Sequence, residues 1–133
     1  MTSDTPDSLR YTPSHEWLRR EGDSPGEVTV GITDFAQDQL GDVVYVDLAA
    51  PGTEVQAGEA CGEIESTKTV AELYAPVAGE VLASNDELAD APELVNASPY
   101  GDGWLLRLRL ADDTALEGLL DAAGYQAALA EES

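Results

Sequence analysis

The sequence predicts a mostly β domain with a short internal helix and a helical region at its C-terminal end. Short segments with alternating hydrophobic residues follow one another along the chain, bounded by glycine and proline, as is typical of strands joined by turns. After residue 112 the leucines take on the spacing of an amphipathic helix. The length of 133 residues and the 43% of hydrophobic residues suit one domain with a modest core.

The first half of the chain is expected to hold strands on both sides of one helix. The predicted strands are residues 15–20, 27–33 and 43–48. The helix lies between the second and third, where Asp34 is expected as the N-cap, Gln37 follows three residues later and Gly41 stands where helices commonly end.

The middle of the chain is predicted to form a hairpin around Ser66-Thr67-Lys68. Its strands, and the strand that follows them, are residues 60–65, 69–74 and 80–83. The sequence of residues 50–55 is weakly echoed in residues 75–81. This repeat suggests two similar β-halves joined at the lysine.

The two ends of the chain differ in character. Residues 1–10 are polar and are expected to be a flexible segment. Residues 86–99 read as a loop with one helical turn, and a strand is expected over residues 104–110. The helical region covers about residues 112–131, and Gly124 is expected to interrupt it.

The net charge is −21, because 27 acidic residues stand against six Lys and Arg residues. The acidic residues are spread along the chain. Such self-repulsion is relieved by salt, so we infer a protein built for high ionic strength. A nucleic-acid partner is not expected, because phosphate binding needs clustered basic residues. No apolar segment is long enough to span a membrane. The acidic start resembles neither a secretory signal nor a transit peptide, and we expect a cytoplasmic protein.

Single copies of cysteine and histidine limit the chemistry of the chain. Cys61 has no partner for a disulfide and is expected to be a small core residue. His15 is the only histidine, and we expect it to have a structural role. No metal site is expected.

Lys68 is the only lysine, and every other basic residue is arginine. Arginine supplies charge but no nucleophilic nitrogen, so Lys68 is a candidate for amide or imine chemistry. Two plainer readings stay open on residue types alone. An acidic surface of this kind sheds lysine in general, and Glu63, Glu65 and Glu72 are near enough in sequence to pair with the ammonium group.

Four segments, in this order along the chain, carry a resemblance to a known family. They are Tyr11 to Trp17, Val30 to Val44, Glu65 to Val81 around the lysine, and Asn96 to Trp104. Together they span about residues 11 to 110 and resemble the glycine cleavage H-protein family, with the third segment similar to its lipoylation site. Thr67 and Thr69 stand where biotin carriers usually have methionine, so a biotin carrier is not expected.

The resemblance implies a hybrid barrel-sandwich of the lipoyl/biotinyl-domain type, with residues 11–133 as a single lipoyl-carrier domain. It implies lipoate in amide linkage to Lys68, on a carrier that is not itself an enzyme. It also implies a cleft that receives the loaded arm, at positions Ser14, Glu16 and Glu72. The last position departs from the family, where a shorter aspartate is expected. For Glu16, a solvated strand residue is the plainer alternative.

The partners implied by the resemblance are enzymes of glycine cleavage. Glycine decarboxylase (the P protein) loads an aminomethyl group on the arm, aminomethyltransferase (the T protein) takes its carbon, and dihydrolipoyl dehydrogenase (the L protein) reoxidises the arm. A lipoate ligase or lipoyltransferase attaches the cofactor. The main alternative is a relay that donates lipoate to other proteins. Two further alternatives to a carrier are an enzyme with a Schiff-base lysine and a purely structural module.

Overall fold

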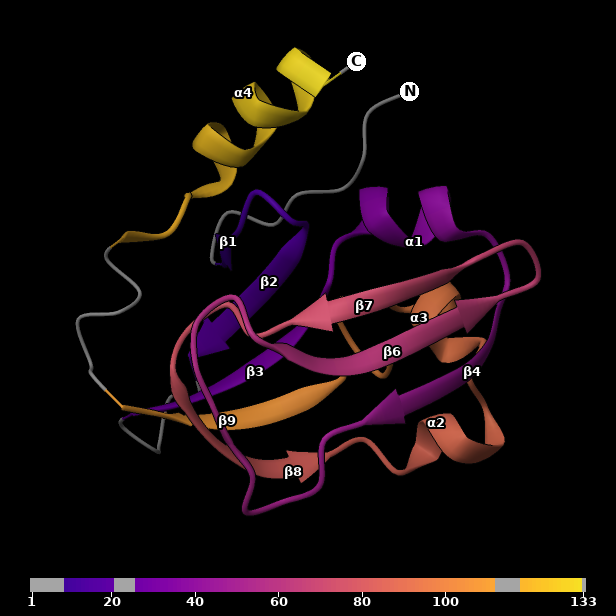
Figure 1. The fold of residues 1–133 in the computed structure, drawn as a ribbon. Coiled ribbons are helices and arrows are strands. Elements are labelled where there is room, and N and C mark those ends of the chain that lie inside the picture. Colours follow the sequence, from indigo (N-terminus) through magenta and orange to yellow (C-terminus); the bar gives the residue numbers. More distant parts are fainter. Residues whose placement is uncertain (1–8, 21–25, 112–117, 133) are drawn as a thin grey trace.

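The computed structural model describes residues 9–20, 26–111 and 118–132. They form antiparallel sheets flanked by helices, as Figure 1 shows. The strands are β1 (Arg10–Tyr11), β2 (Glu16–Arg20), β3 (Glu27–Ile32), β4 (Val43–Leu48), β5 (Glu54–Val55), β6 (Ala60–Ser66), β7 (Val70–Tyr74), β8 (Gly79–Ser84) and β9 (Leu106–Leu110). The helices are α1 (Asp34–Leu40), α2 (Glu87–Asp90), α3 (Leu94–Ala97) and α4 (Ala122–Glu132).

Two sheets share the strands. The larger has the order β1-β2-β3-β9-β8-β5, and the smaller has the order β4-β6-β7. The main core contains residues of both sheets, among them Val30, Ile64 and Leu108. The prediction of a mostly β domain with an internal and a C-terminal helix is therefore confirmed, and the predicted strands through residue 84 are each found within one or two residues of their expected bounds.

The echo in the sequence corresponds to a pairing in space. In the larger sheet β5 is antiparallel to β8, with Glu54 opposite Glu80 and Val55 opposite Gly79. The two similar segments thus lie side by side. The β6–β7 hairpin is formed by the part of the sequence between them (Figure 1).

Helix α1 begins at Asp34, the residue that was predicted as its N-cap, and so one residue earlier than expected. Thr33 is the N-cap: its backbone is extended, and its hydroxyl accepts a hydrogen bond from the N–H of Ala36. Asp34 is the first helical residue, and its carboxylate accepts from the side-chain amide of Gln37 at 2.8 Å. The predicted end is confirmed, because Gly41 closes the helix with a φ of 80°.

The C-terminal prediction was wrong at Leu120 and at Gly124. Leu120 is not helical but forms a β-bridge with Tyr11. The Asp121 carboxylate accepts a hydrogen bond from the N–H of Gly124 at 2.7 Å, as an N-cap does. Gly124 is therefore in the first turn of α4 and does not interrupt the helix. Residues 112–117 lie outside the described residues.

Three other boundaries need correction. Leu9 is buried and β1 starts at Arg10, so the fold begins before the expected boundary after residue 10. The loop over residues 86–99 holds two short helices, α2 and α3, instead of one turn. The last strand starts at Leu106 and not at residue 104, because two backbone carbonyls before it, those of Asp102 and Trp104, accept from the Asn85 side chain.

A second, smaller hydrophobic cluster holds α4 against the edge of the larger sheet. Its buried members are Leu9, Tyr11, Trp17, Ala122 and Tyr125. The Tyr11 and Tyr125 rings stack with centroids 4.8 Å apart. Within the described residues, no helix has the length and apolar character to cross a bilayer.

Cys61 is a core residue, as expected. It is buried in the main cluster of apolar side chains. Burial, with smaller effects from Glu16 and Glu59, raises the pKa of its thiol to about 11. The thiol is therefore protonated and unreactive at neutral pH.

Replacement of Gly31 by alanine is expected to destabilise the fold by about 3 kcal/mol. A Cβ atom at Gly31 would lie 2.6 Å from the ring of Trp17, its cross-strand partner. The ring cannot move aside, because it is fully buried and its Nε1 donates to the carbonyl of Pro99. Urea unfolding measures the loss. Gly118→Ala is the control, since nothing lies within 4 Å of a Cβ there, and an equal loss in both variants would contradict the prediction.

Candidate functional site

Lys68 lies in the turn of the β6–β7 hairpin and is exposed. Figure 1 shows this hairpin extending past the rest of the smaller sheet, near α1. Within the described part of the chain, Lys68 forms no ion pair. The acidic neighbours considered as its partners therefore do not hold the ammonium group. Exposure also argues against a Schiff-base enzyme, which needs an amine in an apolar pocket.

Ser66 holds the turn in shape. Its side-chain oxygen accepts from the backbone N–H groups of Lys68 at 3.2 Å and Thr69 at 3.1 Å. Its own N–H donates to the carbonyl of Thr69 at 2.8 Å. A further bond, from the N–H of Thr67 to the carbonyl of Asp42, ties the turn to the segment between α1 and β4. The backbone that presents Lys68 is therefore fixed on both sides.

The side chain of Lys68 passes close to Gly41 at the end of α1. A Cβ atom at Gly41 would lie 3.2 Å from Cε of Lys68. Asn96 on α3 fixes this glycine: its side-chain amide donates to the carbonyl of Gly41 at 2.8 Å, and its side-chain oxygen accepts from the N–H of Val43 at 2.8 Å. The absence of a side chain at Gly41 thus leaves room for the lysine stem.

Ser66→Ala is expected to lower the unfolding free energy by about 1–2 kcal/mol, since two turn N–H groups lose their acceptor. If Lys68 is the site of an enzymatic modification, the same change is expected to slow it. Urea unfolding measures the first effect, and a time course of modification by intact mass measures the second. Thr67→Ala is the matched control, because the Thr67 side chain is exposed and its backbone bond to Asp42 is retained. Equal modification rates for Ser66→Ala and the native chain would contradict the prediction.

A cleft of about 510 Å³ opens beside the hairpin, between α1 and the start of β2. All three residues predicted for an arm cleft, Ser14, Glu16 and Glu72, line it. Thr69, the residue after Lys68, also forms part of its wall. The cleft therefore combines polar groups with a starting point next to the lysine. Its apolar walls are Ile32, Phe35, Ala36, Leu40, Ile64 and Ala71.

Glu16 is a buried carboxylate, with only 2% of its surface exposed. The solvated strand residue considered as the alternative is therefore wrong. One carboxylate oxygen accepts from the hydroxyls of Thr12 and Ser14, each at 2.7 Å. Burial raises the pKa of Glu16, and these hydroxyls together with the backbone of Tyr74 oppose the shift only in part. A cation in the cleft would favour the ionised form.

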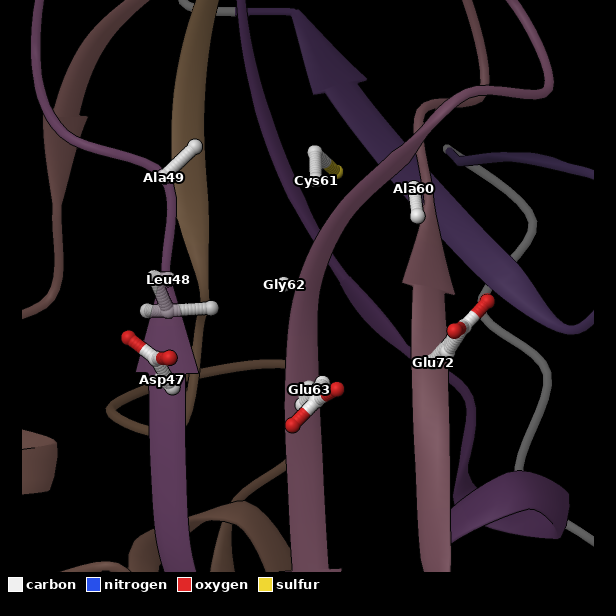
Figure 2. Close-up of a pocket in the computed structure, with 8 residues that line it drawn as sticks. All are labelled: Asp47, Leu48, Ala49, Ala60, Cys61, Gly62, Glu63 and Glu72. Carbon is white, nitrogen blue, oxygen red and sulfur yellow. The ribbon is translucent and has the colours of Figure 1, made fainter.

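Glu72 is at the rim of the cleft and is exposed. Figure 2 shows it on the outer face of the smaller sheet, in a row with Glu63 and Asp47 from the neighbouring strands. The neighbouring Glu72 carboxylate is the main cause of the raised pKa of the Tyr74 hydroxyl. Glu72 lines both the cleft and an outer hollow of about 380 Å³ on this face of the sheet.

Basic residues are absent from the strands of the smaller sheet. All the arginines lie on β1, β2 and β9 of the larger sheet. Arg107 pairs with Glu27, and Arg109 pairs with Glu80. The described hydrophobic side chains that are large and exposed, Val44, Tyr45, Val70 and Tyr74, are on the smaller sheet. The face around Lys68 is thus acidic and partly apolar.

Sequence reasoning missed several residues that build this site. His15 lines the cleft and bonds Tyr125, so its structural role is joined to a place in the site. Phe35 lines the opposite wall. Asn96 reaches the end of α1 from α3. The only signal for Asn96 was that it lies in one of the four segments that resemble the family. Nothing in the sequence pointed to Tyr125 as part of the site.

Comparison with known proteins agrees with this geometry. The family profile described as "Glycine cleavage H-protein" matches residues 9–132. The glycine cleavage system H protein of Micrococcus luteus is 59% identical over 123 residues, which cover 92% of this chain and 95% of that protein. The one from Halorhodospira halophila is 53% identical over 130 residues, which cover 98% of each.

A solved structure shows the same fold. The crystal structure of a glycine cleavage system H protein from Mycobacterium marinum superposes with a TM-score of 0.85 at 40% identity, covering 94% of this chain and 98% of that one. The expected barrel-sandwich architecture is thereby confirmed. From the profile match over nearly its whole length, and from these relatives, the chain belongs to the glycine cleavage H-protein family.

Proposed function

We propose that Lys68 carries a lipoyl group in amide linkage and that the chain is a non-catalytic carrier of the glycine cleavage system. The observation that carries this proposal is the position of the amine. The only lysine of the chain is exposed on a fixed hairpin turn, next to a cleft with polar groups inside. An attaching enzyme can reach this nitrogen, and the cleft can receive what is attached.

The residues present fit a lipoyl group. Acylation removes the charge of Lys68, and no buried acid loses a partner, because the lysine forms no ion pair among the described residues. The apolar walls, including Ile32 and Leu40, suit a hydrocarbon chain. When bound, the lipoyl group supplies sulfur atoms that accept and release a one-carbon unit and then a pair of electrons.

Glu16, Ser14 and Glu72 are proposed to hold a cationic amine inside the cleft. A buried carboxylate with a raised pKa gains most from a cation, because the cation offsets the cost of ionisation. Ser14 already bonds Glu16 at 2.7 Å and keeps its oxygen in place. Glu72 is one methylene longer than the expected aspartate, and its exposed position at the rim suits the entrance of the cleft. Exclusion of water from this space would slow hydrolysis of the cargo.

The partners are then the enzymes that act on the arm. Glycine decarboxylase, aminomethyltransferase and dihydrolipoyl dehydrogenase each need access to the same group, which an exposed hairpin provides. A lipoate ligase or lipoyltransferase would act first, on the bare amine. The acidic and partly apolar face around Lys68 would favour docking surfaces that are basic and partly apolar.

The test is enzymatic lipoylation of the whole chain. Incubation with a lipoate ligase, lipoate and ATP is expected to add the mass of one lipoyl group, and peptide mapping is expected to place it on Lys68. A parallel incubation with a biotin ligase and biotin is expected to add nothing. Addition of biotin, or no addition of lipoate to the folded chain, would contradict the proposal.

A second assay separates the glycine cleavage carrier from a lipoate relay. The lipoylated chain is mixed with glycine decarboxylase, glycine and labelled bicarbonate. Exchange of label into glycine that depends on the lipoylated chain is expected for the carrier. Absence of exchange would favour the relay.

A further inference from the structure

The hydroxyl of Tyr125 bonds both walls of the cleft. Tyr125 is on α4 and is only 1% exposed. Its oxygen is 2.8 Å from Nδ1 of His15 and 2.7 Å from the hydroxyl oxygen of Thr33. His15 belongs to one wall, and Thr33 begins the helix that forms the other. One atom of the C-terminal helix therefore connects the two.

The first wall depends on an unusual backbone conformation at His15. Its φ is 73°, and it is the only non-glycine residue with a positive φ in the described part of the chain. For a residue other than glycine this conformation persists only when its surroundings hold it. The N–H of His15 donates to the carbonyl of Thr12, and its carbonyl accepts from Thr33, each at 3.0 Å. Because His15 stands between Ser14 and Glu16, its conformation decides where their oxygen atoms lie.

The second wall is α1, and Thr33 is its N-cap. The Thr33 hydroxyl accepts from the N–H of Ala36 at 3.2 Å while it bonds Tyr125. Phe35 and Ala36 line the cleft directly. The His15 ring reaches across to Phe35, with centroids 4.8 Å apart. The position of this wall relative to the first thus depends on the group around Tyr125.

Helix α4 packs separately from the main core. Ala122 and Tyr125 belong to the smaller cluster with Tyr11 and Trp17, and none of these is a member of the core between the sheets. The Tyr125 ring is held by stacking on Tyr11, which does not require the hydroxyl. Removal of the hydroxyl alone should therefore leave α4 in place and release the walls.

We propose that Tyr125 is a positioning residue that ties both walls of the cleft to α4 and so keeps the cleft closed around its cargo. The part concerning cargo rests on the proposed function. The part concerning the walls does not, because it can be measured on the unmodified protein.

The first test is hydrogen–deuterium exchange of the unmodified full-length chain. Tyr125→Phe is expected to speed amide exchange about ten-fold or more in both walls, residues 12–16 and 33–40, because each wall loses a buried hydrogen bond worth roughly one factor of ten. Tyr45→Phe removes an exposed hydroxyl and is expected to change neither wall. Unchanged exchange in Tyr125→Phe would overturn the proposal.

Leu129→Ala distinguishes the hydroxyl from the helix as a whole. Leu129 is a partly buried member of the α4 cluster, so its truncation weakens packing but keeps the Tyr125 bonds. It is expected to speed exchange within α4 and not in the two walls. If Leu129→Ala loosens the walls as much as Tyr125→Phe does, the effect belongs to helix packing and the proposed role is wrong.

The second test uses the lipoylated chain charged by glycine decarboxylase. Formaldehyde release measures loss of the carried carbon, and it is expected to be several-fold faster in Tyr125→Phe than in the native chain or in Tyr45→Phe. Faster exchange in the walls without faster release would overturn the role in retention. Failure of the native chain to become lipoylated would overturn the proposed function and leave the exchange result standing.

Discussion

Replacement of Lys68 by arginine is expected to abolish lipoylation and glycine cleavage completely while leaving the fold intact. Arginine retains the positive charge and most of the stem, but its guanidinium does not act as a nucleophile at neutral pH. The Lys68 side chain is exposed and forms no ion pair among the described residues, so little stability is lost. Intact mass after ligase treatment measures lipoylation, and circular dichroism checks the fold.

A double variant tests whether the hairpin, and not just any exposed amine, is required. Lys68→Arg combined with Arg109→Lys moves the only lysine to β9, where the Arg109 side chain is 60% exposed. This chain is expected to remain unmodified, because a flat strand does not present the amine on a turn. Residual glycine cleavage in Lys68→Arg would refute the carrier role, since no other side chain could hold the arm. Modification at position 109 would refute the requirement for the turn.

The parts of the fold that were predictable are those set by local chemistry. Alternation in β3 and the hairpin around Lys68 follow from residues near in sequence, as does the end of α1 at Gly41. The predictions that were wrong concern residues whose conformation is set by contact with a residue far away in the sequence. Leu120 leaves the expected helix because its backbone pairs with Tyr11. Local periodicity holds no information about a strand more than a hundred residues away.

The candidate site divides in the same way. Lys68 stands out by composition, and family resemblance suggested Ser14, Glu16 and Glu72, which the fold brings to one cleft. What the sequence could not show is the burial of Glu16, which comes from packing of β2 against the rest of the domain. A carboxylate in a strand reads as solvated unless the facing elements are known.

Replacement of Glu16 by glutamine is expected to speed loss of the carried carbon by about ten-fold or more, because a charge-assisted hydrogen bond to an ammonium group contributes roughly 1.5–3 kcal/mol. The side chain keeps its size and an oxygen that can accept from Thr12 and Ser14. Lipoylation at Lys68 is expected to proceed at the native rate, since Glu16 is buried away from the attaching enzyme. Formaldehyde release from the charged chain is the measurement.

The same variant is expected to change how stability depends on pH. Burial raises the pKa of Glu16 above its usual value of 4.5. At a pH between 4.5 and the raised pKa, Glu16 therefore keeps a proton in the folded chain that it has lost in the unfolded chain. In this interval the contribution of Glu16 to the free energy of unfolding falls as pH rises, and above the raised pKa it is constant. Glutamine does not titrate, so the variant gains stability relative to the native chain across this interval.

Urea unfolding of both chains at constant salt, from about pH 4 to about pH 8, tests this sign. Subtracting the native free energy of unfolding from that of Glu16→Gln cancels the titration of the other acids, which the two chains share. Glu54→Gln is the control, because Glu54 is exposed and its replacement removes no buried charge. A difference for Glu16→Gln that stays level or falls with rising pH would show that the carboxylate is not penalised by burial. The same result would remove the reason to expect that a cation is drawn into the cleft.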